Sequence, residues 1–124
     1  MSQWESVLRE LPTLHFKETE TTVYEDEVFS IELNLDIHGR THVHFTMKRE
    51  YDKDVHRHMK ELLPVLMAEL VQNGLYTLYT TVPISHEKER KWLTKFIGFV
   101  YDRNVKLLST VDQNQILLRK ELRR

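Results

Sequence analysis

Strict alternation of apolar and polar residues marks two stretches in the first half of the chain. The odd-numbered positions of residues 29–37 are Phe, Ile, Leu, Leu and Ile, and those of residues 43–47 are Val, Phe and Met. Successive side chains of a β-strand point to opposite faces, so each stretch predicts a strand with one buried face. Because only a short segment around Gly39 separates them, the two strands should form a hairpin.

The loop of this hairpin sets its register. A three-residue loop at residues 38–40, with Gly39 near the left-handed conformation, keeps apolar positions opposite one another. A two-residue loop would instead set Ile37 against Arg40 and mix the faces. The three-residue loop is therefore the predicted one. It pairs Ile37 with Thr41, Leu35 with Val43 and Leu33 with Phe45.

The same register gathers polar residues on the opposite face of the hairpin. It sets Asp36 opposite His42 and Asn34 opposite His44, a mixture of ligand types that suits zinc or another transition metal. Alternating histidines on a solvated face need no metal, and no metal site is predicted. The polar set is unsuited to an apolar core, so we expect this face to be open to a partner, to a second copy of the chain or simply to water. The predicted interaction face consists of Glu32, Asn34, Asp36, His42, His44 and Thr46.

Helical spacing of apolar residues appears on both sides of the hairpin. Residues 2–11 could form a short helix, and residues 13–24 follow with an irregular strand pattern. After the hairpin, residues 55–70 predict a long helix that contains Pro64, which removes one backbone hydrogen bond. Asn73-Gly74 should end this helix.

The last third of the chain predicts three strands and one helix. Residues 75–82 form the first strand, and Ser85 should cap the helix that follows. Gly98 suits the left-handed position just past the end of that helix. Residues 99–108 and 115–122 then predict a final strand pair.

Composition and charge exclude several classes of protein. A chain of 124 residues predicts a single domain spanning residues 1–124. Without cysteine it has no disulfide, no thiolate zinc site and no cysteine nucleophile. The net charge of -1 argues against a large nucleic-acid surface. No apolar run is long enough to span a membrane, and the first residues lack the apolar stretch of a secretory signal, so a cytoplasmic protein is expected.

The order of these elements resembles that of the GNAT superfamily of N-acetyltransferases, in particular its short phage-encoded members. The resemblance covers residues 29–124, and its best local match is SHEKERKWLTKFIGF, residues 85–99, which is similar to the family's last helix running through Gly-Phe into the next strand. It implies an α/β fold with a mixed sheet: an antiparallel hairpin, a central parallel pair at residues 41–50 and 75–82 with a helical crossover, and a C-terminal hairpin. The first quarter of the chain is too short for the strand and two helices that usually come first, so the fold should be shortened at its N-terminus.

The resemblance also implies where acyl-CoA would bind, and there the sequence departs from the family. Family members hold the pyrophosphate with a glycine-containing loop at the start of the central helix, but residues 49–62 contain no glycine. Arg49, Lys53 and Arg57 are the candidate cofactor-binding residues, and the alternative is that they are solvated surface charges. No cofactor is therefore expected, unless the chain is an active enzyme that uses acetyl-CoA.

The catalytic groups that the family would imply are incomplete too. Counting back from Gly98 places Thr94 where many members have the tyrosine that protonates the leaving thiolate, and a threonine hydroxyl is a poor acid. If the chain is active, Glu50 is the candidate base and Tyr101 the candidate acid. We therefore expect a GNAT-like module that binds a protein partner or a second copy of itself without ordinary acetyl-CoA catalysis. An active N-acyltransferase with an atypical phosphate loop is the alternative, and neither a nucleic acid nor a membrane is an expected partner.

Overall fold

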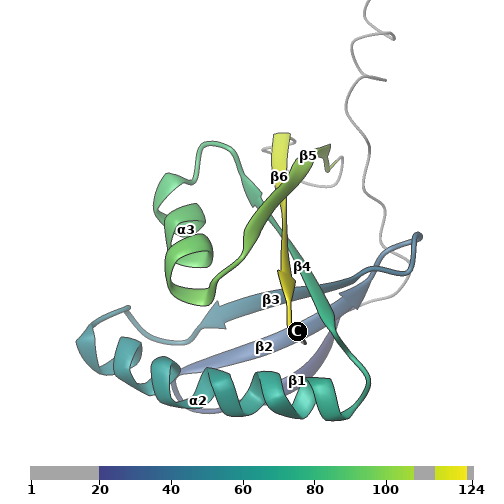
Figure 1. Ribbon diagram of the computed structural model, residues 1–124. Helices are drawn as coiled ribbons and strands as arrows, with labels where there is room; N and C mark the ends of the chain where they lie inside the picture. The colour runs from purple at the N-terminus through teal and green to yellow at the C-terminus, as the bar shows by residue number, and fades with distance from the viewer. Residues whose placement is uncertain (1–19, 108–113, 123–124) are drawn as a thin grey trace, which may run out of the picture.

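The computed structural model describes residues 20–107 and 114–122, so the helix expected at residues 2–11 lies outside it, as does most of the strand expected at 13–24. Figure 1 shows one mixed sheet and two helical segments. The strands are β1 (Thr21–Glu25), β2 (Phe29–Leu35), β3 (Thr41–Met47), β4 (Thr77–Pro83), β5 (Val100–Lys106) and β6 (Asn114–Glu121). The helices are α2 (Lys53–Gln72) and α3 (Glu87–Lys91), which continues as the π-helix η1 (Trp92–Ile97). Among the helices of the described ranges, none has the length and apolar character that a membrane span requires.

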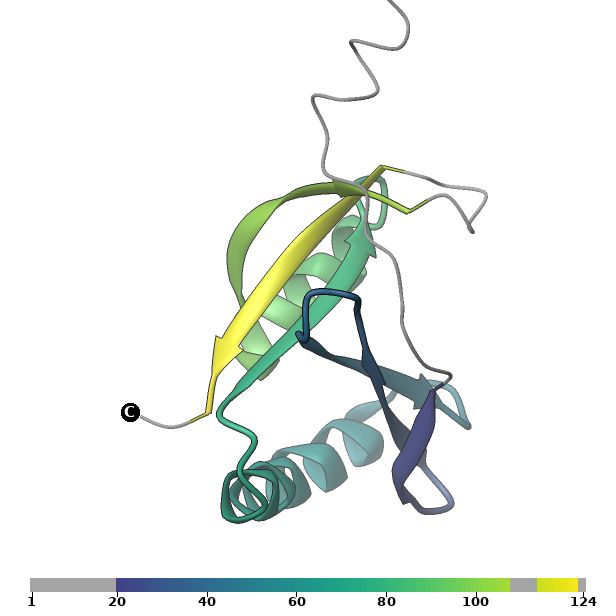
Figure 2. The same cartoon turned by 90° about the vertical axis from the view of Figure 1, so that its right-hand side faces the viewer.

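The sheet has the strand order β1-β2-β3-β4-β6-β5. β3 and β4 run parallel and are joined through α2, while the other neighbours are antiparallel, which confirms the predicted central pair, crossover and hairpins. The parallel strands are matched at one position, His42 opposite Tyr79. Figures 1 and 2 show them diverging from there toward their carboxyl ends. We call this divergence, residues 43–47 of β3 and 80–83 of β4, the fork.

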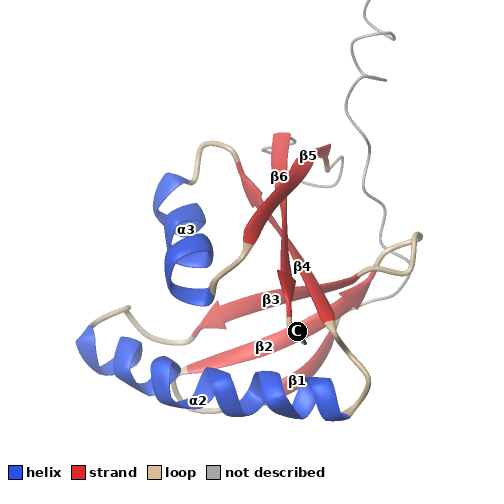
Figure 3. Ribbon diagram, in the orientation of Figure 1, coloured by secondary structure: helices blue, strands red, loops and turns tan. Residues whose placement is uncertain are grey.

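Both helical segments, blue in Figure 3, pack against the same face of the sheet, and the main core lies between them and the strands. A smaller cluster of Val105, Leu107 and Leu117 lies on the other face, because Leu117 and the core residue Leu118 are neighbours on β6. Each large apolar side chain that is fully buried contributes roughly 2 kcal/mol. The main core consists of Phe29, Ile31, Val43, Val55, Met59, Leu63, Leu78, Val82, Leu93, Ile97, Phe99 and Leu118.

The hairpin register predicted from the sequence is wrong by two residues, since Leu35 pairs with Thr41. The backbone amide of Asp36 donates to the carbonyl of Arg40 at 3.0 Å, which closes a three-residue loop one residue earlier than expected. A shift of two keeps every strand residue on its predicted face. It leaves Ile37 in the loop, however, 54% exposed instead of buried in the apolar face.

Glycines end both helical segments as predicted. Gly74 follows α2 with φ +87°, and Gly98 follows η1 with φ +98°, a conformation that strains other residues. The helix begins later than predicted: a turn precedes it, its N-cap residue is His86 and not Ser85, and the His86 side chain makes no cap hydrogen bond. The π-helical ending is also unpredicted: the amide of Gly98 donates to the carbonyl of Leu93, five residues back.

Candidate functional site

Aromatic side chains from three elements meet at the fork on the helix-covered face. Phe45 of β3 meets Trp92 of η1 edge-on, with 5.6 Å between ring centroids, and Trp92 Nε1 donates to the Tyr51 hydroxyl at 2.9 Å. His56 of α2 packs on Phe96 of η1 with 4.3 Å between centroids. We call Phe45, Tyr51, His56, Trp92 and Phe96 the aromatic cluster. It ties the start of α2 to η1 across the fork.

The resemblance would place a pyrophosphate at the start of α2, but a carboxylate of the protein already occupies this position. Asp52 is the N-cap, and its Oδ1 accepts the amide of Val55 at 2.8 Å. Its Oδ2 accepts from Arg49 at 2.9 Å. The bond from Val55, assisted by Arg49, lowers the pKa of Asp52, so this side chain is ionised at neutral pH. Asp54 adds a second carboxylate in the first turn, and both complement the positive end of the helix.

The three candidate cofactor-binding residues lie together at this end of α2, but they differ in their contacts. Arg49 is paired with Asp52, whereas Lys53 and Arg57 are exposed on the first turns of the helix. The segment therefore offers exposed positive charge beside two carboxylates.

The candidate catalytic residues are not brought together. Glu50 is exposed between β3 and α2. Tyr101 lies on the edge strand β5, 61% exposed and donating to Asn104, and β6 and β4 separate β5 from β3. Thr94 is occupied as a donor within its own helix, since its hydroxyl donates to the carbonyl of Arg90 at 2.9 Å.

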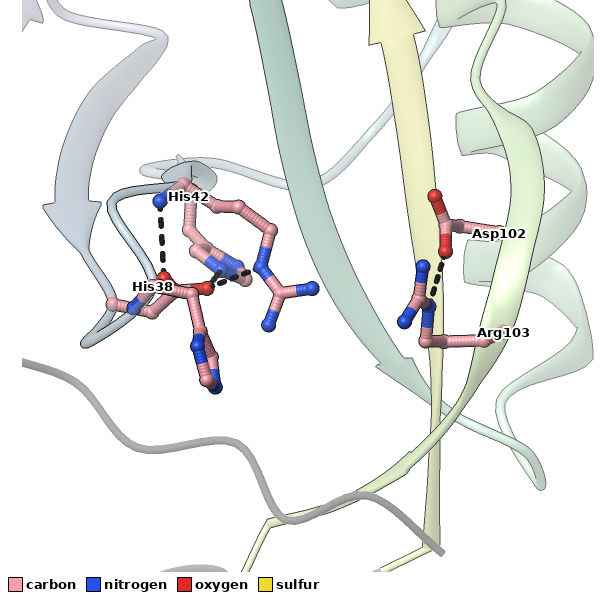
Figure 4. Close-up of polar contacts among 6 residues, drawn as sticks. His38, His42, Asp102 and Arg103 are labelled. Carbon is pink, nitrogen blue, oxygen red and sulfur yellow. Dashed lines mark hydrogen bonds and ion pairs between the residues drawn. The ribbon is translucent and has the colours of Figure 1, made fainter.

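A small polar pocket of about 60 Å³ lies at the fork on the other face of the sheet. His42 lines it, and His42 Nε2 lies 2.8 Å from Oδ2 of the buried Asp36. The same carboxylate accepts from Arg40 Nε at 2.8 Å and from the amides of His38 and Arg40 at 2.8 and 3.0 Å. Figure 4 shows these contacts beside His42, with the separate ion pair of Asp102 and Arg103 across β4. The pocket is lined by Glu20, Asn34, His42, Val43, His44, Thr80 and Thr81.

The protonation of this network follows from its burial. Burial alone would raise the pKa of Asp36, but hydrogen bonds from His42, from Arg40 and from the His38 amide lower it to about 2. Burial lowers the pKa of His42, although the bond to Asp36 opposes that shift. His42 is therefore neutral at neutral pH, and the nitrogen facing the ionised Asp36 carries the hydrogen. An imidazole oriented by a buried carboxylate can in principle accept a proton at its other nitrogen.

The predicted interaction face is only partly available. Asp36 is 0% exposed and His42 is 5% exposed, so neither can contact a partner, because the backbone of the turn folds around the Asp36 carboxylate. Asp36 is also not opposite His42 in the sheet, where Asn34 stands instead. The half-buried or exposed members are Glu32, Asn34, His44 and Thr46. Across the described ranges, no group of three or more His, Asp or Glu side chains is placed to hold a metal ion.

Sequence reasoning missed Asp52, Tyr51 and Trp92. Asp52 does carry a local signal, because an aspartate just before an apolar stretch of helical period is a common N-cap. The bond between Tyr51 and Trp92 joins residues 41 positions apart, and no local pattern predicts it.

No family model matches the sequence, and no curated protein does. Solved structures do match. An aminoglycoside 6'-acetyltransferase type Ii superposes on 82% of this chain and 67% of its own length, with a TM-score of 0.58 and 14% identity. A Desulfovibrio desulfuricans protein assigned to the GNAT family of acetyltransferases superposes on 81% of this chain and 65% of its own, with a TM-score of 0.55 and 14% identity. The fold is that of the GNAT acetyltransferases.

A third structure with this GNAT fold is that of YncA from Salmonella typhimurium with its cofactor acetyl-CoA. It superposes on 78% of this chain and 59% of its own length, with a TM-score of 0.56 and 11% identity. The chain thus spans 59% to 67% of the length of these three proteins, which confirms the expected shortening. At such low identity the likeness concerns the fold alone, and function has to be argued from the site.

Proposed function

We propose that this chain uses a GNAT fold to bind another macromolecule, a protein or a second copy of itself, and does not bind acyl-CoA in the ordinary way. The observation that carries the proposal is the start of α2. There the Asp52 carboxylate accepts the helix amide that a pyrophosphate would need, and Asp54 adds a like charge. Bringing a pyrophosphate to this point requires breaking the cap and overcoming repulsion from two carboxylates.

The aromatic cluster supports the same conclusion. Tyr51, which follows β3, and Trp92 of η1, which follows β4, are hydrogen-bonded to each other at the open end of the fork. Phe45 packs edge-on against Trp92. A ligand chain entering between β3 and β4 from the helix-covered face would have to separate them. That would cost the hydrogen bond and the ring contacts together.

We propose that the partner binds the part of the hairpin face that stays accessible. His44 and Thr46 are exposed on β3, and Glu32 lies beside them on β2, 3.3 Å from Thr46. The surface is polar, as the rim of a protein interface is. We further propose that the protein is phage-encoded, as the sequence resemblance implies, and that it works in the cytoplasm.

Acetyl-CoA binding tests the first half of the proposal. Calorimetry and thermal unfolding with micromolar to millimolar acetyl-CoA should show no complex, whereas a ligand at about 100 times its Kd adds about 2.7 kcal/mol of stability. A stoichiometric micromolar complex would reverse the proposal.

Charge substitution tests the second half. His44→Glu should weaken self-association by light scattering, or capture of a partner protein, while leaving the fold intact by circular dichroism. Gln72→Glu makes the same change of charge at the exposed end of α2 and serves as the matched control. Equal association of both variants and the unchanged protein would remove the hairpin face from consideration. His42 is unsuitable for this test because it is buried.

An active N-acyltransferase remains the second candidate, and the bond between Asp36 and His42 favours it. A neutral histidine that is held by a buried carboxylate and lines the polar pocket at the fork has the partner that general bases often have. In that case acetyl transfer to a panel of amines should be lost in His42→Gln but retained in Glu50→Gln. Loss in Glu50→Gln or Tyr101→Phe would instead assign the roles suggested by the sequence.

A further inference from the structure

A larger pocket lies away from the fork, on the helix-covered face. It measures about 470 Å³ and is bounded by the middle of α2, the end of η1 and the end of β6. Leu63 and Ile97, each 7% exposed, belong to the main core and also line the pocket. We call it the α2–η1 pocket. Its apolar lining consists of Leu63, Pro64, Met67, Phe96, Ile97 and Leu122. Pockets of this size and character accommodate small organic ligands.

Two ammonium groups stand beside these apolar walls. Lys60 of α2 and Lys120 of β6 both line the pocket, and among the described residues neither has an ion pair or a hydrogen bond. The one carboxylate in the lining, Glu121, is already engaged. Thr77 donates to its Oε2 at 2.8 Å, and Arg119 lies 3.5 Å from its Oε1. The pocket therefore presents uncompensated positive charge next to apolar surface.

Gly98 leaves room for one of these ammonium groups. Lys120 Nζ lies 3.0 Å from the place where a β-carbon on Gly98 would stand. This puts the charge at the end of η1, next to Ile97, where the last carbonyls of the helix favour a cation. The ammonium group is thus located at the pocket and is available to a bound anion.

We propose that the α2–η1 pocket binds a small amphipathic carboxylate, an aliphatic chain or an aromatic ring that carries one carboxylate. The apolar part would cover Met67, Phe96 and Leu122, and the carboxylate would pair with Lys60 and Lys120. A neutral head group would leave both ammonium groups without a partner, and a cationic one would meet two like charges. The pocket therefore selects on charge. This pocket shares only Phe96 with the aromatic cluster and no residue with the polar pocket at the fork, so the proposal does not depend on what binds at the fork.

Three probes with the same chain length test this selection on the full chain: octanoate, 1-octanol and octylammonium. Binding is followed by NMR through the side-chain methyl groups of Met67, Ile97 and Leu122. Octanoate should shift these signals and bind about tenfold more tightly than 1-octanol, with octylammonium weaker still. Equal binding of octanoate and 1-octanol would overturn the proposal, as would octanoate shifts confined to other parts of the protein.

Substitutions test whether Lys60 and Lys120 supply the positive charge that binds octanoate. The double variant Lys60→Gln, Lys120→Gln should bind octanoate about tenfold more weakly while its affinity for 1-octanol is unchanged. Lys88→Gln, at an exposed position of α3 outside the pocket lining, is the control and should bind octanoate as the unchanged protein does. Equal octanoate affinity in the double variant and the control would overturn the proposal. The substituted lysines have accessible side chains, so each variant should fold, and circular dichroism is the check.

Discussion

The turn of the β2–β3 hairpin and the start of α2 each place one aspartate against free backbone amides. Asp36 accepts the amides of His38 and Arg40, and Asp52 accepts the amide three residues after it. Their surroundings differ. Asp36 is 0% exposed and also receives the side chains of Arg40 and His42, whereas the side chain of Asp52 is 46% exposed.

The two aspartates also face opposite sides of the fork. Asp36 orients His42 at the polar pocket, and Asp52 occupies the helix start beside the aromatic cluster. Asp36 therefore orients a histidine, and Asp52 caps the helix start at which, in the proposed function, no anion binds. Comparing them separates what the fold needs from what the proposed function needs.

The largest effect should come from Asp36→Ala. It leaves two amides, the Arg40 guanidinium and His42 without their acceptor, and we expect the free energy of unfolding to fall by about 3 kcal/mol or more. Urea unfolding followed by circular dichroism measures the loss. Ile37→Ser, an exposed position in the same loop, is the control and should change stability by less than about 0.5 kcal/mol. Similar values for the two variants would show that the Asp36 network is not the main support of the turn.

Acidification should also cost stability, in two steps. His42 has a pKa below its ordinary value, so its stabilising effect is complete above about pH 6.5 and is lost as pH falls below that. Asp36 has its pKa lowered from 3.8 to about 2, so its contribution, about 2 kcal/mol, is present above pH 3.8 and is lost as pH falls toward 2. Urea titrations between pH 7 and pH 2 should show a smaller loss below pH 3.8 in Asp36→Asn than in the unchanged protein, and the loss that remains comes from groups such as Asp26, whose pKa is also lowered. Parallel curves for the two proteins would contradict the assignment.

Asp52→Ala should be milder than Asp36→Ala, because the Asp52 side chain is 46% exposed and water can take its place at the helix start. Global stability should fall by well under half of the Asp36→Ala loss. Amide hydrogen exchange should quicken at residues 53–56 and stay unchanged in β2 and β3. A loss as large as that of Asp36→Ala would mean that exposure does not explain the difference between the two sites.

The smallest effect should come from Tyr51→Phe. The variant keeps the ring and removes the hydroxyl that accepts from Trp92 at 2.9 Å and contacts His56 at 2.7 Å. We expect a loss of about 0.5–1 kcal/mol, the net value of a partly exposed hydrogen bond. Trp92 fluorescence should shift while the unfolding cooperativity stays the same. An unchanged emission spectrum would show that the two side chains are not bonded in solution.

Much of the fold could be predicted from local patterns, and the hairpin shows where such prediction stops. Alternation assigned Ile31 and Val43 to the buried face correctly, since a strand has only two faces. It could not distinguish registers that differ by two residues, because both keep the faces the same. The Asp36 turn made that choice, through bonds between side chain and backbone that alternation does not describe.

The site was predicted less well, for a related reason. Local patterns expected Asp36 and His42 to be exposed because both are polar and stand opposite the apolar face, yet they are buried around one another. A polar side chain can be buried when its partners are present, and a pattern of residue types does not show partners. The bond between Tyr51 and Trp92 was also beyond the reach of sequence reasoning, since the parallel crossover alone brings them together.

Local sequence was enough to predict the spacing of apolar residues, the strands and helices that follow from that spacing, and the left-handed helix ends at Gly74 and Gly98. Each of these features depends on backbone geometry within a few residues. Long-range packing decided which aspartate is buried, how the start of α2 is tied to η1 and that Lys60 and Lys120 line one pocket. Those outcomes depend on segments far apart in the chain coming into contact, and on whether packing leaves room for water between them.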